Sequence, residues 1–205
     1  MSTAAVQAAL EAVQAFPGRA GFYWQDLASG EEAEFRGAEP FEAASVIKLP
    51  VLVELFRQLE AGEAREEEPF TIREEEKLPS CGALNYLHTG VTVSLMDLGV
   101  LMVILSDNTA TNLLIRRLGM ERIQAAMTAL GMETSALRRL LFDSEAAGRG
   151  IKNTIAPREM GRLLAGLYRG EIVSPGASRR MLGILGDQRL KGKIHFWLDG
   201  KVNCS

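Results

Sequence analysis

The chain has 205 residues, of which 47% are hydrophobic, and this composition is typical of a globular protein rather than a disordered one. Its 23 lysines and arginines nearly balance its 26 aspartates and glutamates, and a formal net charge of -3 offers no general attraction for nucleic acid or an anionic membrane. Two cysteines, Cys81 and Cys204, are too few for a disulfide framework, and no apolar run is long enough to span a membrane.

The first segment predicts a helix and no export signal. Residues 3–16 alternate small apolar and polar residues at helical spacing, and Pro17 and Gly18 end the pattern. A secretory signal would begin with a basic patch followed by an apolar stretch, which this N-terminus lacks. On this ground we expect a cytoplasmic protein.

A β-hairpin is expected next. Residues 20–28 predict one strand, residues 29–32 a turn, and residues 32–37 a second strand. A lone two-stranded hairpin is marginally stable in water, so this sheet is expected to gain a strand from the tail, residues 187–205. We also expect that an unpaired sheet edge allows the chain to form a homodimer.

The helical part of the chain is expected from about residue 45 to about residue 186. Its first helix begins at Ser45 and runs to about Gly62. The acidic segment 63–77 that follows is expected to be solvated surface.

Residues 92–106 predict the next helix, which opens with a capping box formed by Ser94 and Asp97. Apolar residues lie on every side of it, so we expect this helix to be central and buried all round. Two further helices, at 108–119 and 120–131, each end at a glycine.

The remaining helices follow an irregular segment at 132–156. They are expected at 156–170 and 173–186, and each has a proline near its start. Two strands followed by a long run of helices indicate an α+β fold, and without repeats or a linker the chain is expected to form a single domain over residues 1–205.

The stretch ASVIKLPV, residues 44–51, contains the first candidate site. Ser45 lies three residues before Lys48, and side chains at this spacing share one face of a helix. A buried lysine at a helix start has a lowered pKa and can serve as the base that a nucleophilic serine requires. The alternative is that Ser45 caps the helix beside a surface lysine. Pro50 also predicts an irregular first turn.

The second candidate motif is the tripeptide Ser106-Asp107-Asn108, directly after the apolar helix. All three residues are common at helix N-termini, and capping is therefore its ordinary interpretation. A hydroxyl and an amide at this junction can also relay a proton and hold a substrate carbonyl.

Other catalytic arrangements find little support in the sequence. The two histidines, His88 and His195, are not paired, and there is no Gly-x-Ser-x-Gly motif, which argues against a Ser-His-Asp hydrolase. The same lack of paired ligands argues against a zinc site. Cys81 is expected to be a structural thiol near the cleft.

Together, the two motifs resemble those of the class A β-lactamases and the related penicillin-binding serine enzymes. A Ser-x-x-Lys at Ser45 is followed 61 residues later by Ser-Asp-Asn at Ser106, and residues 152–164 resemble the segment after the family's omega loop. This resemblance covers nearly the whole chain. It implies a β-lactamase-like α/β sandwich, in which a large helical region packs beside an antiparallel sheet.

The resemblance also implies a role for each site residue. Ser45 would be the acylated nucleophile, Lys48 would accept its proton, and Ser106 would pass a proton to the leaving nitrogen. Asn108 would hold Lys48 or the substrate, and the Ser45 N–H would form half of the oxyanion hole.

The family's third motif, Lys-Thr-Gly, is absent from the sequence. The family spacing places it just after Ser205, so we expect a chain truncated before this motif. Only the N-terminal hairpin and at most one C-terminal strand of the family's sheet would then be present.

The omega loop departs from the family pattern as well. Hydrolytic members carry a glutamate there that activates the deacylating water, and this chain offers Asp143 and Glu145 in a different context. We assign the catalytic position to Glu145, although both residues are also typical of ordinary loop acids.

We therefore expect a serine hydrolase that opens β-lactam amides through an acyl-enzyme on Ser45, with weak turnover. One alternative is a non-catalytic or truncated relative that binds β-lactams or peptides without turnover, and another is a small-ester hydrolase. The resemblance implies a small-molecule β-lactam or peptide-like substrate, with no cofactor and no metal. Members of the family are usually exported, in contrast to the cytoplasmic location expected above.

Overall fold

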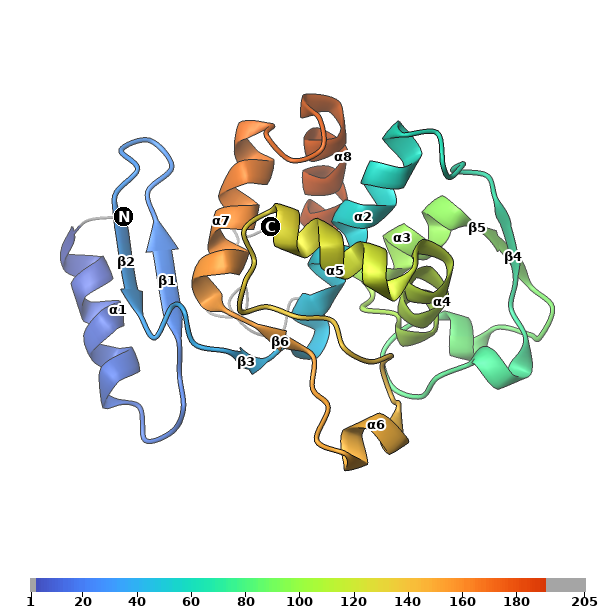
Figure 1. Cartoon of the computed structure of the whole chain (residues 1–205), viewed down its shortest axis with the longest axis horizontal. Helices are drawn as coiled ribbons and strands as arrows, with labels where there is room; N and C mark the ends of the chain where they lie inside the picture. The colour runs from blue at the N-terminus through green and yellow to red at the C-terminus, as the bar shows by residue number, and fades with distance from the viewer. Residues whose placement is uncertain (1–2, 191–205) are drawn as a thin grey trace.

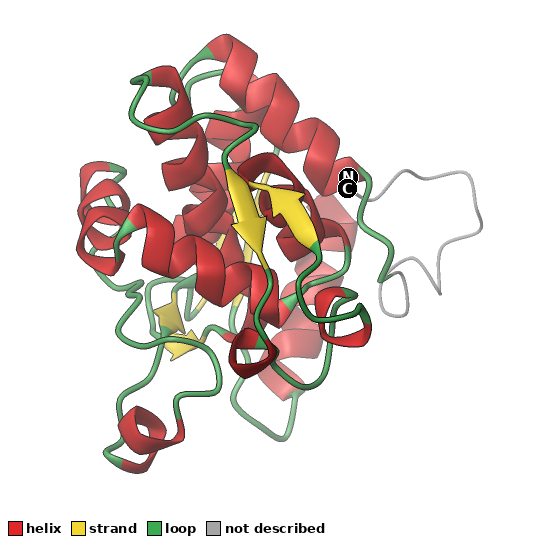
Figure 2. Ribbon diagram, turned by 90° about the vertical axis from the view of Figure 1, so that its right-hand side faces the viewer, coloured by secondary structure: helices red, strands yellow, loops and turns green. Residues whose placement is uncertain are grey.

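The computed structural model describes residues 3–190, which form helices and small antiparallel strand pairs (Figures 1 and 2). The α-helices are α1 (Thr3–Ala15), α2 (Lys48–Glu60), α3 (Leu95–Ile104), α4 (Asn108–Leu118), α5 (Met120–Ala129), α6 (Ser144–Gly148), α7 (Pro157–Arg169) and α8 (Pro175–Gly186). The strands are β1 (Phe22–Gln25), β2 (Glu32–Phe35), β3 (Phe41–Glu42), β4 (Pro69–Thr71), β5 (Thr92–Ser94) and β6 (Thr154–Ile155). Short 3-10 turns are η1 (Ala44–Ile47), η2 (Glu74–Glu76) and η3 (Leu84–Tyr86). The expected α+β fold is confirmed.

The N-terminal hairpin lies at one end of the molecule, between α1 and α7 (Figure 1). Strands β1 and β2 pair antiparallel, with Phe22 opposite Phe35 and Gln25 opposite Glu32. The predicted helix at 3–16 and the predicted hairpin at 20–37 are thus confirmed. The strand expected in the tail lies outside the described residues.

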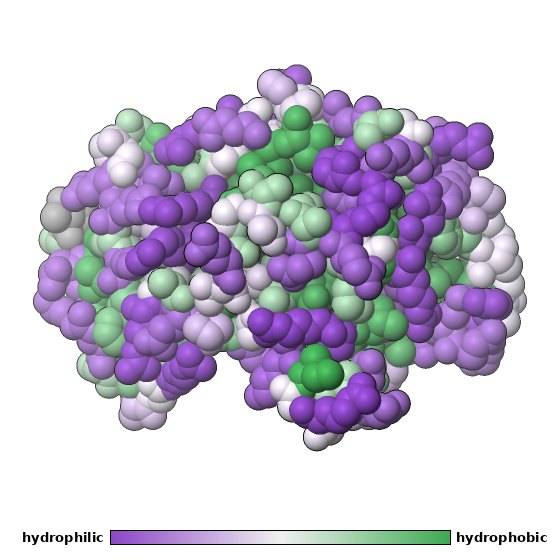
Figure 3. Space-filling view, viewed as in Figure 1, coloured by the Kyte–Doolittle hydropathy of each residue, from purple (hydrophilic) through white to green (hydrophobic). Residues whose placement is uncertain are grey.

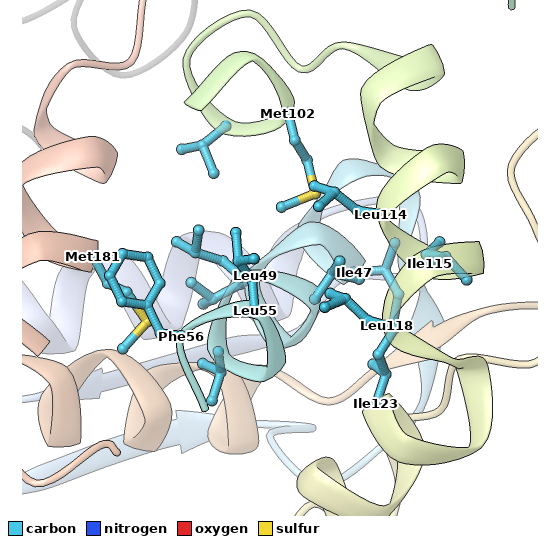
Figure 4. Close-up of a cluster of buried hydrophobic side chains, with 14 of the residues drawn as sticks. Ile47, Leu49, Leu55, Phe56, Met102, Leu114, Ile115, Leu118, Ile123 and Met181 are labelled. Atoms are coloured by element: carbon cyan, nitrogen blue, oxygen red, sulfur yellow. The ribbon is translucent and has the colours of Figure 1, made fainter. Parts of the chain in front are cut away.

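Helix α2 is the central helix, and its side chains fill the space between α3, α4, α5 and α8 (Figure 4). Every residue from Lys48 to Phe56 is buried. Its polar residues are buried because they find partners: Glu54 accepts hydrogen bonds from Arg57 and Gln58, and Gln58 also donates to the Leu118 carbonyl.

The prediction that residues 92–106 form the helix buried all round is therefore wrong. Helix α3 buries one side, on which Leu95, Leu98 and Met102 lie, whereas Met96 and Leu101 are only partly buried. The apolar sequence of α3 suggested complete burial, but the outer side of the helix is covered only in part. The capping box of Ser94 and Asp97 at its start is confirmed.

Two further strand pairs lie in segments for which no strand was predicted. Strands β4 and β5 pair at the end of the molecule opposite the hairpin (Figures 1 and 2), and Pro69 is tolerated there as the first residue of β4. Strands β3 and β6 pair through Phe41 and Ile155. This second pair joins the segment just before Ser45 to the segment just before α7, and so fixes both beside the site.

The helix boundaries follow local signals in the sequence. Gly119 and Gly131 end the predicted helices at 108–119 and 120–131, with φ angles of 90° and 75° that favour glycine. Prolines at the starts of α7 and α8 occupy positions where the backbone N–H has no partner within the helix. Within residues 3–190, no helix has the length and apolar character needed to cross a membrane.

Candidate active site

Ser45 lies in the 3-10 turn η1, which leads directly into α2. It caps neither element: the N-cap residues are Ala43 and Ile47, and neither uses a side chain for capping. Instead, its Oγ accepts a hydrogen bond from Ser106 Oγ at 2.8 Å. The capping interpretation of Ser45 is therefore wrong, whereas the irregular first turn predicted from Pro50 is confirmed.

Lys48 points toward the Ser-Asp-Asn segment rather than directly at Ser45. Its Nζ donates to the Ser106 carbonyl and to Ser106 Oγ, both at 2.7 Å, and to Asn108 Oδ1 at 3.1 Å. Lys48 is thus linked to Ser45 through the Ser106 hydroxyl, not by the direct contact that the three-residue spacing suggested. Of the two roles expected for Asn108, the structure shows that it holds Lys48.

Burial controls the protonation of Lys48. Only 4% of the residue is exposed, and burial lowers the pKa of its ammonium from the ordinary 10.5 to about 8, although Cys81 and Asp107 act in the opposite direction. All three acceptors of its hydrogen bonds are uncharged oxygens. Lys48 can therefore lose its proton near neutral pH while it remains oriented by these acceptors.

Ser106 connects α3 to α4 in a strained backbone conformation. Its φ is +53°, in the left-handed region that is unfavourable for a residue with a side chain. This bend turns the carbonyl and the hydroxyl of the same residue toward Lys48 Nζ. Such strain is common at active sites, where it orients a catalytic group.

Asp107 fixes the backbone of residues 83–84, which lie just after Cys81 at the rim of the site. One of its carboxylate oxygens caps α4 by accepting from the Ala110 N–H at 2.9 Å, and the other accepts from the N–H groups of Ala83 and Leu84 at 2.7 and 2.9 Å. Gly82 has a φ of +125°, and a Cβ there would lie 2.3 Å from Asp107 Oδ2. The capping role of Asp107 was anticipated, but its hold on residues 83–84 was not.

Ser45 opens into a cleft of about 490 Å³. Its lining comes from four segments: the approach to α2, the rim around Cys81, the start of α4, and the loop 139–153. The lining residues are Glu42, Ala44, Ser45, Ser80, Cys81, Asn108, Arg139, Leu141, Phe142, Asp143, Ser144, Ala147 and Asn153. A small molecule in this cleft would meet the Ser45 hydroxyl, while Lys48 lies behind it.

The two acids of the loop 139–153, Asp143 and Glu145, do not join the hydrogen-bonded cluster around Lys48. Glu145 lies on α6, its side chain is 83% exposed, and it pairs with Arg149 at 3.1 Å outside the cleft. Asp143 lines the cleft, and its Oδ1 caps α6 by accepting from the Ala146 N–H at 2.8 Å. The structure thus brings Ser45, Lys48, Ser106 and Asn108 together and leaves Glu145 apart from them.

Sequence reasoning missed two asparagines that fix the loop wall of the cleft. Asn112 donates to the Leu141 carbonyl and accepts from the Leu141 N–H, both at 2.9 Å. It lies four residues after Asn108 on α4, a spacing that places both amides on one face of the helix and could have revealed it. Asn153 accepts from the N–H groups of Arg138 and Arg139 and donates to the Arg139 carbonyl.

Comparisons with known proteins bear on this arrangement. The sequence matches the β-lactamase enzyme family over residues 3–203. The chain belongs to this family. It is 30% identical over 174 residues to a β-lactamase of Streptomyces lavendulae, a match that covers 82% of this chain and 56% of that protein. The chain thus spans just over half the length of this curated relative.

Solved structures show the same fold. A β-lactamase from Sphaerobacter thermophilus has 30% sequence identity and a TM-score of 0.88, over 98% of this chain and 76% of that one. A mutant of PBP-A, solved as an acyl-enzyme complex with penicillin G, has 30% identity and a TM-score of 0.82, over 92% and 70% of the two chains. An ancestral class A β-lactamase, at 24% identity and a TM-score of 0.84, shares the fold.

Proposed function

We propose that this protein is a serine acyl-transfer enzyme that opens the amide bond of β-lactams and forms an ester with Ser45 Oγ. The observation that carries the proposal is the chain of hydrogen bonds from Lys48 through Ser106 to Ser45 at the rim of the cleft. Membership of the β-lactamase family and the β-lactamases among its relatives support the same chemistry.

In the proposed acylation, neutral Lys48 takes a proton from Ser106 Oγ as Ser106 takes one from Ser45 Oγ. The freed Ser45 oxygen bonds to the lactam carbonyl carbon and gives a tetrahedral intermediate. When the carbon–nitrogen bond of the ring breaks, Ser106 gives the leaving nitrogen a proton and recovers one from the Lys48 ammonium. The products are a Ser45 ester and a ring-opened amine, and Lys48 is neutral again.

The surroundings of these residues suit the two charges that arise during the reaction. The Lys48 ammonium forms beside three oxygen acceptors within 3.1 Å, and the negative charge of Asp107 also stabilises it. The oxyanion forms near Ser45 at the start of η1, and the first backbone N–H groups of a helical turn have no carbonyl partner within it. We propose the Ser45 N–H as one donor to this oxyanion.

We further propose that the Ser45 ester is long-lived. Hydrolysis needs a base that activates water beside the ester, and the only acids that line the described cleft are Glu42 and Asp143. Glu42 pairs with Lys152 at 3.3 Å, and Asp143 caps α6. Glu145 lies outside the cleft, and each of the two carboxylates in it already has a partner among the described residues, so we expect water activation to be slow.

A chromogenic cephalosporin tests this proposal, because ring opening changes its colour. The expected result is a rapid burst of about one equivalent followed by slow turnover, the signature of an accumulating acyl-enzyme. Ser45→Ala should abolish the burst, whereas Ser144→Ala, which removes another hydroxyl from the cleft, should retain it. Equal bursts from the two variants would contradict the proposal.

A nitrophenyl ester, assayed beside the cephalosporin, separates this function from its alternatives. A small-ester hydrolase would turn over the ester without reacting with the cephalosporin. A relative that only binds β-lactams would react with neither compound.

A further inference from the structure

Phe142 combines two unfavourable features in the cleft that contains Ser45. Its φ is +58°, a left-handed conformation that is uncommon for a bulky side chain, and 51% of the residue is exposed to solvent. It lines the cleft but does not belong to the hydrophobic core, whereas its neighbour Leu141 packs against that core. The aromatic side chain of Phe142 is therefore not explained by packing.

The backbone on both sides of Phe142 is fixed. Leu141 is held by the two hydrogen bonds to the Asn112 amide, and Asp143 is held as the N-cap of α6. Because both neighbours are held, Phe142 cannot relax to a right-handed conformation without breaking one of these contacts. The loop thus maintains an exposed aromatic side chain in the wall of the cleft, and such strain persists where the surrounding structure imposes it.

Two of the polar side chains on this wall are engaged by the backbone. The Arg139 guanidinium donates to the carbonyls of Ile151 and Leu140 at 3.0 and 3.1 Å, and the Asn153 amide is bonded to backbone groups at 138–139. The same wall offers apolar surface from Leu141, Phe142 and Ala147. Figure 3 shows hydrophobic, green surface on the lobe that carries α6.

We propose that Phe142 is a specificity-determining residue, which packs against an aromatic or apolar side chain carried by the acyl group on Ser45. Ser45 and Phe142 line the same cleft, so an acyl group attached to the serine can reach the exposed Phe142 ring on the loop 139–153. An aromatic side chain gains from burial against the Phe142 ring, and an acyl group without one gains nothing there. This inference rests on the acyl transfer proposed for Ser45.

The test compares two penicillins with the same ring system. Benzylpenicillin carries a phenylacetyl side chain, and 6-aminopenicillanic acid carries none. Phe142→Gly removes the ring and suits the left-handed backbone, so the protein should retain its fold. We expect the rate of Ser45 acylation by benzylpenicillin, followed by intact mass spectrometry, to fall about tenfold. Acylation by 6-aminopenicillanic acid should stay within about twofold of the parent protein.

Two further variants serve as controls for folding and for the general loss of an exposed aromatic side chain. Phe142→Asn also tolerates the left-handed conformation, and it should reproduce the effect if the glycine variant does not fold. Phe16→Ala removes another exposed aromatic side chain, from outside the cleft, and should leave both rates unchanged. An equal loss of rate with both penicillins, or no loss with benzylpenicillin, would overturn the role of Phe142.

A second pair of probes separates this inference from the proposed function. Nitrophenyl phenylacetate and nitrophenyl acetate differ in the same side chain but contain no β-lactam. If neither penicillin reacts with the parent protein, the β-lactam proposal fails, and the preference between the two esters decides the role of Phe142. A parent protein whose Ser45 reacts with neither pair overturns both.

Discussion

Asn108→Asp should shift the acylation reaction to higher pH. Asn108 Oδ1 lies 3.1 Å from Lys48 Nζ, so the substitution keeps an oxygen at this position and adds a negative charge to it. An opposite charge this close raises the pKa of an amine by about 1 to 3 units, because it stabilises the ammonium. The pKa of Lys48, which burial lowers to about 8, should therefore return toward its ordinary value.

The expected loss of rate follows from the neutral fraction of Lys48. With a pKa of about 8, roughly one-tenth of Lys48 is neutral at pH 7. A rise of 1 to 3 units lowers that fraction about 10- to 1000-fold, and acylation at pH 7 should fall by the same factor. At higher pH, Lys48 loses its proton again and the rate should recover.

The assay is the rate of Ser45 acylation by benzylpenicillin between pH 6 and pH 10. Asn108→Ala is the matched control, because it also removes the hydrogen bond from Asn108 Nδ2 to the Pro79 carbonyl but adds no charge. The midpoint of the rate–pH profile of the Asn108→Ala variant should not move to higher pH. If the rate–pH profile of Asn108→Asp has the same midpoint as that of the parent protein, Lys48 is not the base and the proposed proton transfer is refuted.

The remaining predictions concern the base, the rim and the loop acids. Lys48→Arg keeps the positive charge but cannot lose it near neutral pH, so acylation should fall by orders of magnitude in a protein that remains folded by circular dichroism; an unchanged rate would make Lys48 a bystander. Gly82→Ala should lower the free energy of unfolding by roughly 1–3 kcal/mol in urea titrations, because its Cβ meets Asp107 and its φ is positive, and equal stability would contradict the close packing of the rim. Asp143→Asn and Glu145→Gln should leave residual cephalosporin turnover unchanged, and a lost turnover in either variant would identify that acid as the deacylating base.

Much of the candidate site could be predicted from the sequence because its residues lie in two short motifs. The tripeptide at 106–108 is uncommon, and its separation from Ser45 is typical of the family. The distance from Lys48 to Ser45 could not be predicted in the same way, since it depends on η1. The 3-10 turn changes the angle between the two residues, and the side chain of Ser106 then lies between them.

The central helix was misplaced because burial was inferred from apolar residues alone. Helix α2 contains Lys48, Glu54 and Gln58, which an amphipathic pattern assigns to the surface, yet all three are buried and hydrogen-bonded. The strand pairs β3–β6 and β4–β5 were missed because strands of two or three residues carry too little alternation to recognise.

The central claim, that Ser45 forms a long-lived ester, can be tested with one measurement. The protein is exposed briefly to benzylpenicillin, freed of unbound drug, and followed over time by intact and peptide mass spectrometry. We predict an adduct with the full mass of the drug, because ring opening releases no atoms, on the peptide that contains Ser45. It should persist long after the drug is removed and should be absent from Ser45→Ala. An adduct on another residue, an adduct that survives in Ser45→Ala, or rapid release of hydrolysed drug would contradict the claim.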